Sequence, residues 1–180
     1  MATEIENYNP QAVLKANRKR AYKIWAGSGL AVVGWMFLIL LAPIARSNGW
    51  TGLSEPLYKF FRFLCHQMPE RSFYLVGNQL AVCSRCFGVY FGLVFGFLIY
   101  PLIRSIDEIE PLPRVWLFLS VVPIGVDWSL GVLGIWDNTH LSRFVTGLIL
   151  GSMCAIFIIP ALVELGQLIS NKRNKKGLPV

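Results

Sequence analysis

The sequence predicts an all-α integral membrane protein: a compact four-helix transmembrane bundle with an amphipathic interfacial helix in the first outer loop. Of its 180 residues, 54% are hydrophobic and only 15% are charged, whereas about 25% are charged in an ordinary soluble domain. The mean hydropathy is +0.52. Four apolar segments are each long enough to cross a hydrocarbon core of about 30 Å as a helix.

The net charge of +7 does not indicate a nucleic-acid partner. Nucleic-acid binding requires Lys and Arg side chains clustered on one exposed face, and here they stand between long uncharged runs. The composition therefore excludes a soluble enzyme, a disordered tail and a DNA-binding module. The expected partner is the lipid bilayer.

The four spans are expected at about 24–45, 84–103, 115–136 and 144–163. Each must be helical, because lipid offers no hydrogen-bond partner to a free backbone group. The spans divide the chain into a membrane domain over residues 22–165 and two basic tails, over residues 1–21 and 166–180.

The basic tails predict the orientation in the membrane. Lys and Arg accumulate on the cytoplasmic side, and four spans return the chain to the side on which it starts. We therefore expect a plasma-membrane protein with both termini in the cytoplasm and the loop over about 46–85 outside. Basic residues also occur in that loop and count against this orientation. The basic residues of the tails are Lys15, Arg18, Lys19, Arg20, Lys23, Lys172, Arg173, Lys175 and Lys176.

The first loop is expected to contain its own helix. Leu57, Phe60, Phe61 and Leu64 fall at positions i, i+3, i+4 and i+7, which is one face of an α-helix. Such a helix either lies in the membrane interface or packs on the end of the bundle.

Three of the four cysteines lie in or beside this loop. Cys65 precedes His66, and Cys83 and Cys86 form a C-x-x-C pair where the second span begins. Two intervening residues let both sulfurs converge on one ion or on each other. With His66 the three thiols make a Cys₃His set that suits zinc, and Cu(I) or an iron–sulfur cluster is also compatible with thiolates. His140, in the other outer loop, is the alternative fourth ligand.

Two other interpretations of the thiols stay open. An oxidising compartment favours a disulfide or a redox pair. The start of a helix, with Arg85 between the two thiols, also favours a thiolate. Alternatively the cysteines only pack, as we expect of Cys154 in the middle of the fourth span.

Two motifs resemble those of a known family. Residues 65–73 read C-H-Q-M-P-E-R-S-F and residues 83–90 read C-S-R-C-F-G-V-Y, followed by Asp127 and by Arg143-x-x-x-Gly147. This pattern is similar to that of small predicted membrane proteins of bacteria and archaea, grouped as a domain of unknown function, over about residues 57–163. The resemblance implies a compact multi-span helical fold and no particular reaction. Phe87 stands where the family has a threonine, which leaves the thiols in place.

Asp127 is the only acidic residue inside a predicted span. An ionisable residue within the membrane is costly, and by default it indicates a functional site with a partner. Arg143, at the start of the fourth span, is the expected partner, because its long stem can reach inward. Asn138 and Arg85 are expected to complete the polar network. The network either locks the bundle together or relays protons or ions.

Glycines predict which spans pack together. Gly88, Gly92 and Gly96 recur every four residues in the second span, and Gly147 and Gly151 do so in the fourth. Small residues at this spacing let two membrane helices approach until their backbones touch. The second span is therefore expected to pack on the fourth, or the same faces could form a homodimer.

The sequence is compatible with three functions, and it does not decide whether the protein is an enzyme. The first is a membrane protein with a Cys/His metal site, expected to hold zinc, on its outer face above Asp127 and Arg143. The second is a membrane thiol–disulfide oxidoreductase that uses Cys83 and Cys86. The third is a subunit of a small ion or metabolite transporter, which Asp127 alone supports. No motif identifies a substrate.

Overall fold

Long apolar runs form the main helices of the protein. The computed structural model describes residues 10–108, 110 and 112–176, so residues 1–9 and 177–180 of the expected tails lie outside the described residues. Four helices are long and apolar enough to span a membrane, which confirms the predicted fold class. In chain order the elements are α1 (Pro10–Ser47), α2 (Thr51–Arg62), the short 3₁₀ helix η1 (Pro69–Arg71), the strands β1 (Tyr74–Leu75) and β2 (Asn78–Gln79), α3 (Ser84–Ile103), α4 (Val115–Val132) and α5 (His140–Lys176).

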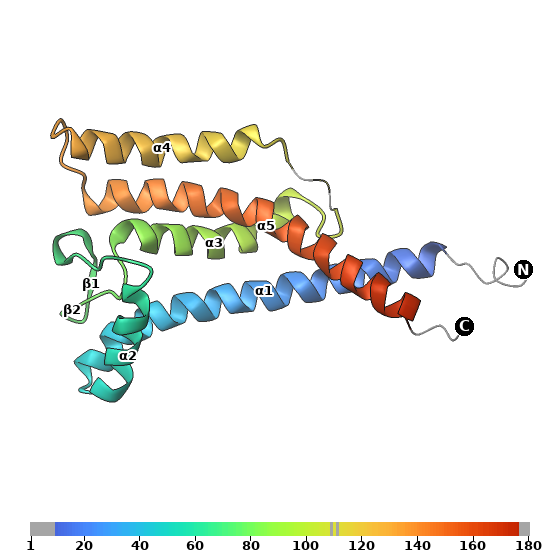
Figure 1. Ribbon diagram of the computed structural model, residues 1–180, viewed down its shortest axis with the longest axis horizontal. Helices are drawn as coiled ribbons and strands as arrows, with labels where there is room; N and C mark the ends of the chain where they lie inside the picture. Colours follow the sequence, from blue (N-terminus) through green and yellow to red (C-terminus); the bar gives the residue numbers. More distant parts are fainter. Residues whose placement is uncertain (1–9, 109, 111, 177–180) are drawn as a thin grey trace, which may run out of the picture.

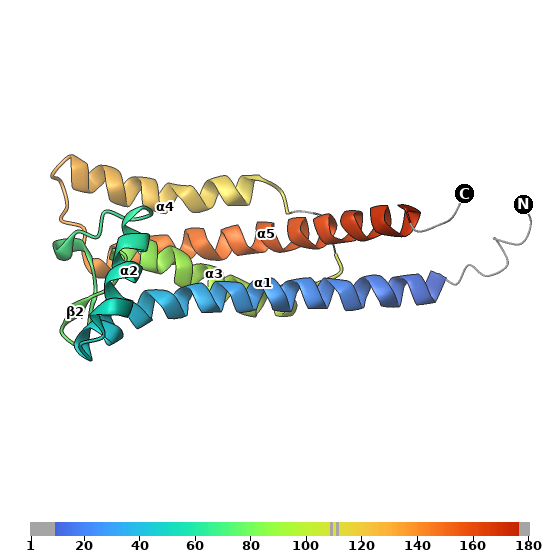
Figure 2. The same cartoon turned by 60° about the horizontal axis from the view of Figure 1, so that its bottom comes forward.

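The long helices lie side by side, with α5 between α4 and α3 and with α1 on the other side of α3 (Figures 1 and 2). The C-terminal ends of α1 and α4 meet the N-terminal ends of α3 and α5 at one end of the bundle, together with α2 and the antiparallel β1–β2 hairpin. We call this end the loop end. The start of α1 and the end of α5 lie at the opposite end of the bundle.

Two helices extend beyond the expected spans, and one is shorter. α1 and α5 continue into the basic segments that flank the membrane. α4 ends at Val132 rather than near residue 136, because the chain closes it with a Schellman motif. There Gly134 has a φ of +67°. Its N–H donates to the Gly131 carbonyl at 3.4 Å, and the Ile135 N–H donates to the Leu130 carbonyl at 3.1 Å.

The predicted amphipathic helix is α2, and it packs on the end of the bundle. Phe61 is fully buried in a cluster with Ile39 and Ala42 of α1, and its ring lies 5.4 Å from that of Trp35. Phe60 keeps 47% of its surface exposed. α2 therefore anchors the first loop to α1 while leaving an apolar edge uncovered.

The closest contact in the bundle joins α3 and α5 through the glycines that the sequence singles out. A Cβ added at Gly92 would overlap the Leu148 carbonyl oxygen, and one added at Gly151 would overlap the Val89 carbonyl oxygen. Gly88, Gly96 and Gly147 face the other helix in the same way. Both glycine faces are thus covered within one chain.

Substitution of Gly151 should separate the two helices. In Gly151→Ala the new methyl group would meet backbone atoms of Val89, and overpacking of this kind typically costs about 1–3 kcal/mol. We expect a clear loss of thermal stability in detergent. Gly34→Ala is the matched control, because a Cβ there would meet nothing within 4 Å. Equal unfolding temperatures for the two variants would contradict the contact.

Candidate metal centre

The structure brings three of the four cysteines together at the loop end. The sulfur atoms of Cys65, Cys83 and Cys86 all lie within 4.8 Å of one another. Cys65 is buried, and the other two are half-buried. Cys154 lies within α5 and does not belong to this group. All four cysteines are free of disulfide bonds.

The start of α3 positions two of the thiols. Cys83 is the N-cap residue of α3, and its carbonyl accepts the first helical hydrogen bond, from the Phe87 N–H at 2.9 Å. Cys86 lies within the first turn of the same helix, so the C-x-x-C spacing directs both sulfurs toward one point. The Cys83 N–H also donates to the Cys65 sulfur at 3.2 Å, which ties the end of the first loop segment to α3.

Gln67 holds the segment that carries Cys65. Its backbone has a φ of +51°, which is uncommon for a residue other than glycine. Its side-chain amide donates to the Tyr58 carbonyl at 2.9 Å and to the Ala81 carbonyl at 2.7 Å. The Gln79 amide in turn donates to the Gln67 carbonyl at 2.6 Å. The bend at Gln67 is therefore fixed from both sides, close to the thiols.

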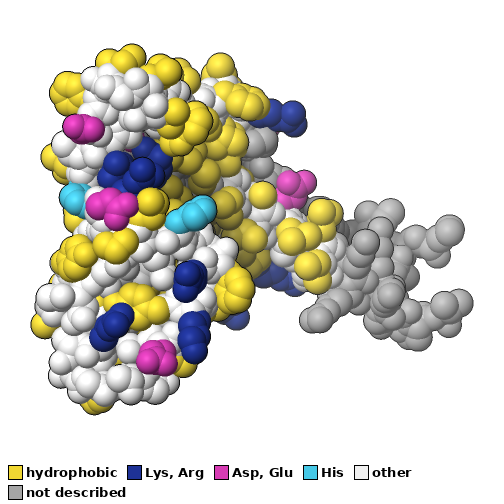
Figure 3. All heavy atoms as spheres, turned by 60° about the vertical axis from the view of Figure 1, so that its left-hand side comes forward, with side chains coloured by type: hydrophobic (Ala, Val, Ile, Leu, Met, Phe, Trp, Pro, Cys, Tyr) yellow, Lys and Arg dark blue, Asp and Glu magenta, His cyan; other side chains and the backbone are white. Residues whose placement is uncertain are grey.

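The thiol cluster opens into a cavity of about 400 Å³. Beside the three cysteines, the cavity is lined by Gln67, His66 and three arginines, Arg71, Arg85 and Arg143, and no acidic side chain lines it. Figure 3 shows this end of the molecule, with Lys and Arg side chains grouped near the two histidines.

Neither histidine belongs to the group of converging ligand atoms. His66 is exposed and lines the cavity. His140 makes a different contact, since its Nδ1 lies 2.9 Å from the Ser84 hydroxyl, which itself donates to the Arg71 carbonyl at 3.0 Å. His140 thereby joins α5 to α3 and to the loop, and it packs on the Phe73 ring at 5.5 Å.

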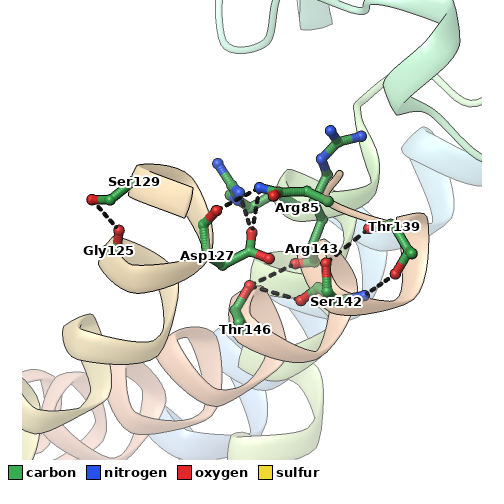
Figure 4. A network of polar contacts seen from close by, with 9 residues as sticks. Arg85, Gly125, Asp127, Ser129, Thr139, Ser142, Arg143 and Thr146 are labelled. Carbon is green, nitrogen blue, oxygen red and sulfur yellow. Dashed lines mark hydrogen bonds and ion pairs between the residues drawn. The ribbon is translucent and has the colours of Figure 1, made fainter. Parts of the chain in front are cut away.

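Asp127 pairs with a different arginine from the one that the sequence suggested. Its carboxylate forms an ion pair with Arg85 of α3, and the two side chains are 9% and 22% exposed. The Asn138 amide donates to the Asp127 carbonyl at 2.6 Å and to its carboxylate at 3.1 Å. Figure 4 shows Asp127 on α4 facing Arg85. The expected ion-pair partner, Arg143, is therefore wrong: Asp127 pairs with Arg85, and within the described ranges Arg143 forms no ion pair.

The position of Cys83 favours a thiolate. Hydrogen bonds from Cys65 and Cys86, together with backbone N–H groups of the first turn of α3, hold the pKa of the Cys83 thiol well below its ordinary value. Burial opposes this shift but does not cancel it. A thiolate is the form that binds a metal ion or attacks a disulfide.

Two residues of this site, Arg71 and Ser84, were not singled out from the sequence. Arg71 lies inside the first cysteine motif, a few residues after Cys65 and His66, and its place in that motif was the available signal. Ser84, within the second motif, is fully buried and joins Arg71 to His140. Nothing in the spacing indicates that contact, because its partner is 56 residues away.

Together these features define a multi-pass helical membrane protein with a thiol cluster at one end. The chain belongs to the DUF2085 family, described as predicted membrane proteins, whose pattern it matches over residues 65–157. The match includes the three clustered cysteines, Asp127 and Arg143.

Two archaeal proteins, both described as uncharacterized, are similar to this chain. One, from Methanocaldococcus jannaschii, is 38% identical over 133 residues, which cover 71% of this chain and 85% of that protein. The other, from Methanothermobacter thermautotrophicus, is 33% identical over 96 residues, covering 53% of this chain and 85% of that protein. No solved structure matches the chain.

The ion pair should be measurable in a double-mutant cycle. Removing one member of a buried pair costs about 3–5 kcal/mol, and we expect Asp127→Asn and Arg85→Gln each to approach the lower figure because Arg85 is partly exposed. The double variant should lose clearly less than the sum, as judged by unfolding in detergent. The same cycle with Arg143→Gln serves as the comparison. Stronger coupling of Asp127 to Arg143 than to Arg85 would contradict this pairing.

Proposed function

We propose that this membrane protein binds one zinc ion through Cys65, Cys83 and Cys86. The observation that carries the proposal is the convergence of three sulfur atoms within 4.8 Å at the mouth of a cavity. Zn–S bonds of about 2.3 Å in a tetrahedral site place the sulfurs about 3.8 Å apart. Small side-chain adjustments therefore suffice for the three thiolates to bind one ion.

The set of donors favours zinc over the other thiolate-binding centres. An iron–sulfur cluster usually takes four cysteines, and Cys154 lies outside the group. Cu(I) also suits thiolates, so the metal analysis must distinguish it from zinc.

His66 is the proposed fourth ligand. It follows Cys65 directly and lines the same cavity as the thiols, and no hydrogen bond within the described residues holds its ring elsewhere. His140 is less suitable, because its Nδ1 contacts Ser84 and its ring packs on Phe73. A Cys₃His shell of this kind is typical of closed, structural zinc sites.

The site is proposed to face the outside of the plasma membrane. The supporting observation is that the start of α1 and the end of α5, which adjoin the basic tails, lie at the opposite end from the thiols. Lys and Arg near the ends of spans favour the cytoplasmic side.

Labelling with a membrane-impermeant thiol reagent should test this orientation. In a Cys154→Ser background, Lys15→Cys and Lys172→Cys should add no labelling on intact cells over the background, because both tails are cytoplasmic. Lys59→Cys, on the exposed face of α2 at the loop end, should add labelling. The reverse pattern would contradict the orientation while leaving the metal proposal standing.

Metal content should depend equally on each clustered thiol. We expect about one zinc per chain in protein purified without chelator, as measured by mass spectrometry of the metal. Cys65→Ser, Cys83→Ser and Cys86→Ser should each lose most of it, because every thiolate supplies part of one coordination shell.

Cys154→Ser is the matched control and should keep its zinc. His66→Ala should lower the zinc content, and His140→Ala should not. A strong chelator should also lower the unfolding temperature, since metal binding stabilises the folded state. Equal zinc in wild type and Cys83→Ser would refute the site.

The closeness of the Cys83 and Cys86 thiols at the start of α3 favours one second candidate, a thiol–disulfide oxidoreductase. In that role the Cys83 thiolate attacks one sulfur of a substrate disulfide, and Cys86 then displaces the reduced substrate as the Cys83–Cys86 disulfide forms. Metal-free wild type, reduction of a model disulfide by wild type, and unequal losses of that activity in Cys83→Ser and Cys86→Ser would favour this candidate.

A further inference from the structure

Three arginines from three separate elements line the cavity over the thiols. Arg71 comes from η1, Arg85 from α3 and Arg143 from α5. The three arginines are close together, because all three also line a second cavity of about 230 Å³. A guanidinium group stays protonated in proteins, so the cavity carries three fixed positive charges.

Carboxylate side chains of the protein neutralise little of the positive charge of these three arginines. Asp127 pairs with Arg85, and among the described residues no carboxylate lies within the 4.0 Å ion-pair distance of Arg71 or Arg143. The Nε of Arg85 is buried and has no hydrogen-bond partner in the described part of the chain. Arg71 and Arg143 therefore bring positive charge to the cavity that no ion pair within the described residues offsets.

Arg85 and Arg143 are half-buried and Arg71 is exposed. Like charges repel one another, and the repulsion between the two half-buried arginines is stronger than it would be in water. A zinc ion held by three thiolates would carry one net negative charge, which still leaves the cavity positive. The arrangement is therefore stabilised by an anion that several guanidinium groups can share.

We propose that this cavity binds a phosphate group through Arg71, Arg85 and Arg143. Guanidinium forks match the geometry of phosphate oxygens and bind them with two parallel hydrogen bonds. A carboxylate offers two oxygens and one charge, whereas a phosphate monoester offers three free oxygens and up to two charges. A phosphate monoester therefore suits three arginines that reach the cavity from three different elements.

The phosphate belongs either to a free inorganic phosphate ion or to a lipid headgroup that is a phosphate monoester, as in phosphatidic acid. Leu64 and Met68 line the same cavity, and the neighbouring Phe63 is 90% exposed, so an apolar edge adjoins the basic side chains. Both sources present the same phosphate chemistry to the arginines, and the experiment distinguishes them.

Calorimetric titration of the purified full chain, in a detergent without phosphate groups, tests the proposal. One arm uses inorganic phosphate and the other uses short-chain phosphatidic acid. We expect saturable binding in at least one arm. Arg71→Gln and Arg143→Gln should each weaken it at least about tenfold, as the loss of a charge-assisted hydrogen bond implies.

Arg62→Gln is the matched control, because Arg62 is an exposed arginine of α2 that does not line the cavity; it should bind like wild type. Arg71→Lys should give an intermediate loss, since it keeps the charge but not the fork. Tighter binding of phosphatidic acid than of inorganic phosphate identifies a lipid headgroup, and equal binding identifies the free ion.

The phosphate site does not depend on the proposed metal. Arg71→Gln should elute from gel filtration like wild type and keep the metal content of wild type, so a failure of zinc binding would show in the wild type and leave the titrations interpretable. Absence of saturable binding in both arms would overturn the proposal. So would equal affinities in Arg71→Gln, Arg143→Gln and Arg62→Gln.

Discussion

The backbone contact between α3 and α5 is the constraint on which the loop end depends. Gly147 lies against the Arg85 carbonyl, and Gly88 lies against the Phe144 carbonyl, so the contact begins within the first two turns of both helices. Those turns carry Cys86 and Arg143, which line the cavity together. Because side chains would separate the backbones here, small residues decide how far apart the thiols and the arginine lie.

Opposite charges hold the loop end together at close range. The Cys83 thiolate, the Asp127 carboxylate and the arginines share a small, partly buried region. Removing any one of these charges leaves an opposite charge without its compensation in surroundings of low dielectric constant, which costs stability. The proposed metal ion at the thiols and the proposed anion at the arginines would both contribute to this balance from outside the chain.

Reasoning from the sequence predicts the helices well and their contacts less well. Length and hydropathy predicted the four spans, and residue spacing predicted both the amphipathic α2 and the approach of Cys83 to Cys86. The partner of Asp127 was wrong, because Arg143 was chosen for its depth along a neighbouring span, whereas the rotation of each helix about its axis decides which arginine faces Asp127. The glycine spacing indicates how α3 and α5 face each other, but no comparable pattern in the sequence indicates how α4, which carries Asp127, is rotated against them.

The position of α4 at the edge of the bundle has a consequence for variation among related sequences. α4 packs chiefly on α5, and most of its large side chains face outward, Phe118 and Val132 among them. One face, with Asp127 and Gly131, meets fixed neighbours, since a Cβ at Gly131 would overlap Asn138. Substitutions among apolar residues should therefore accumulate along the outward stripe of α4, where lipid accepts any similar shape, and should be rare along the inner one.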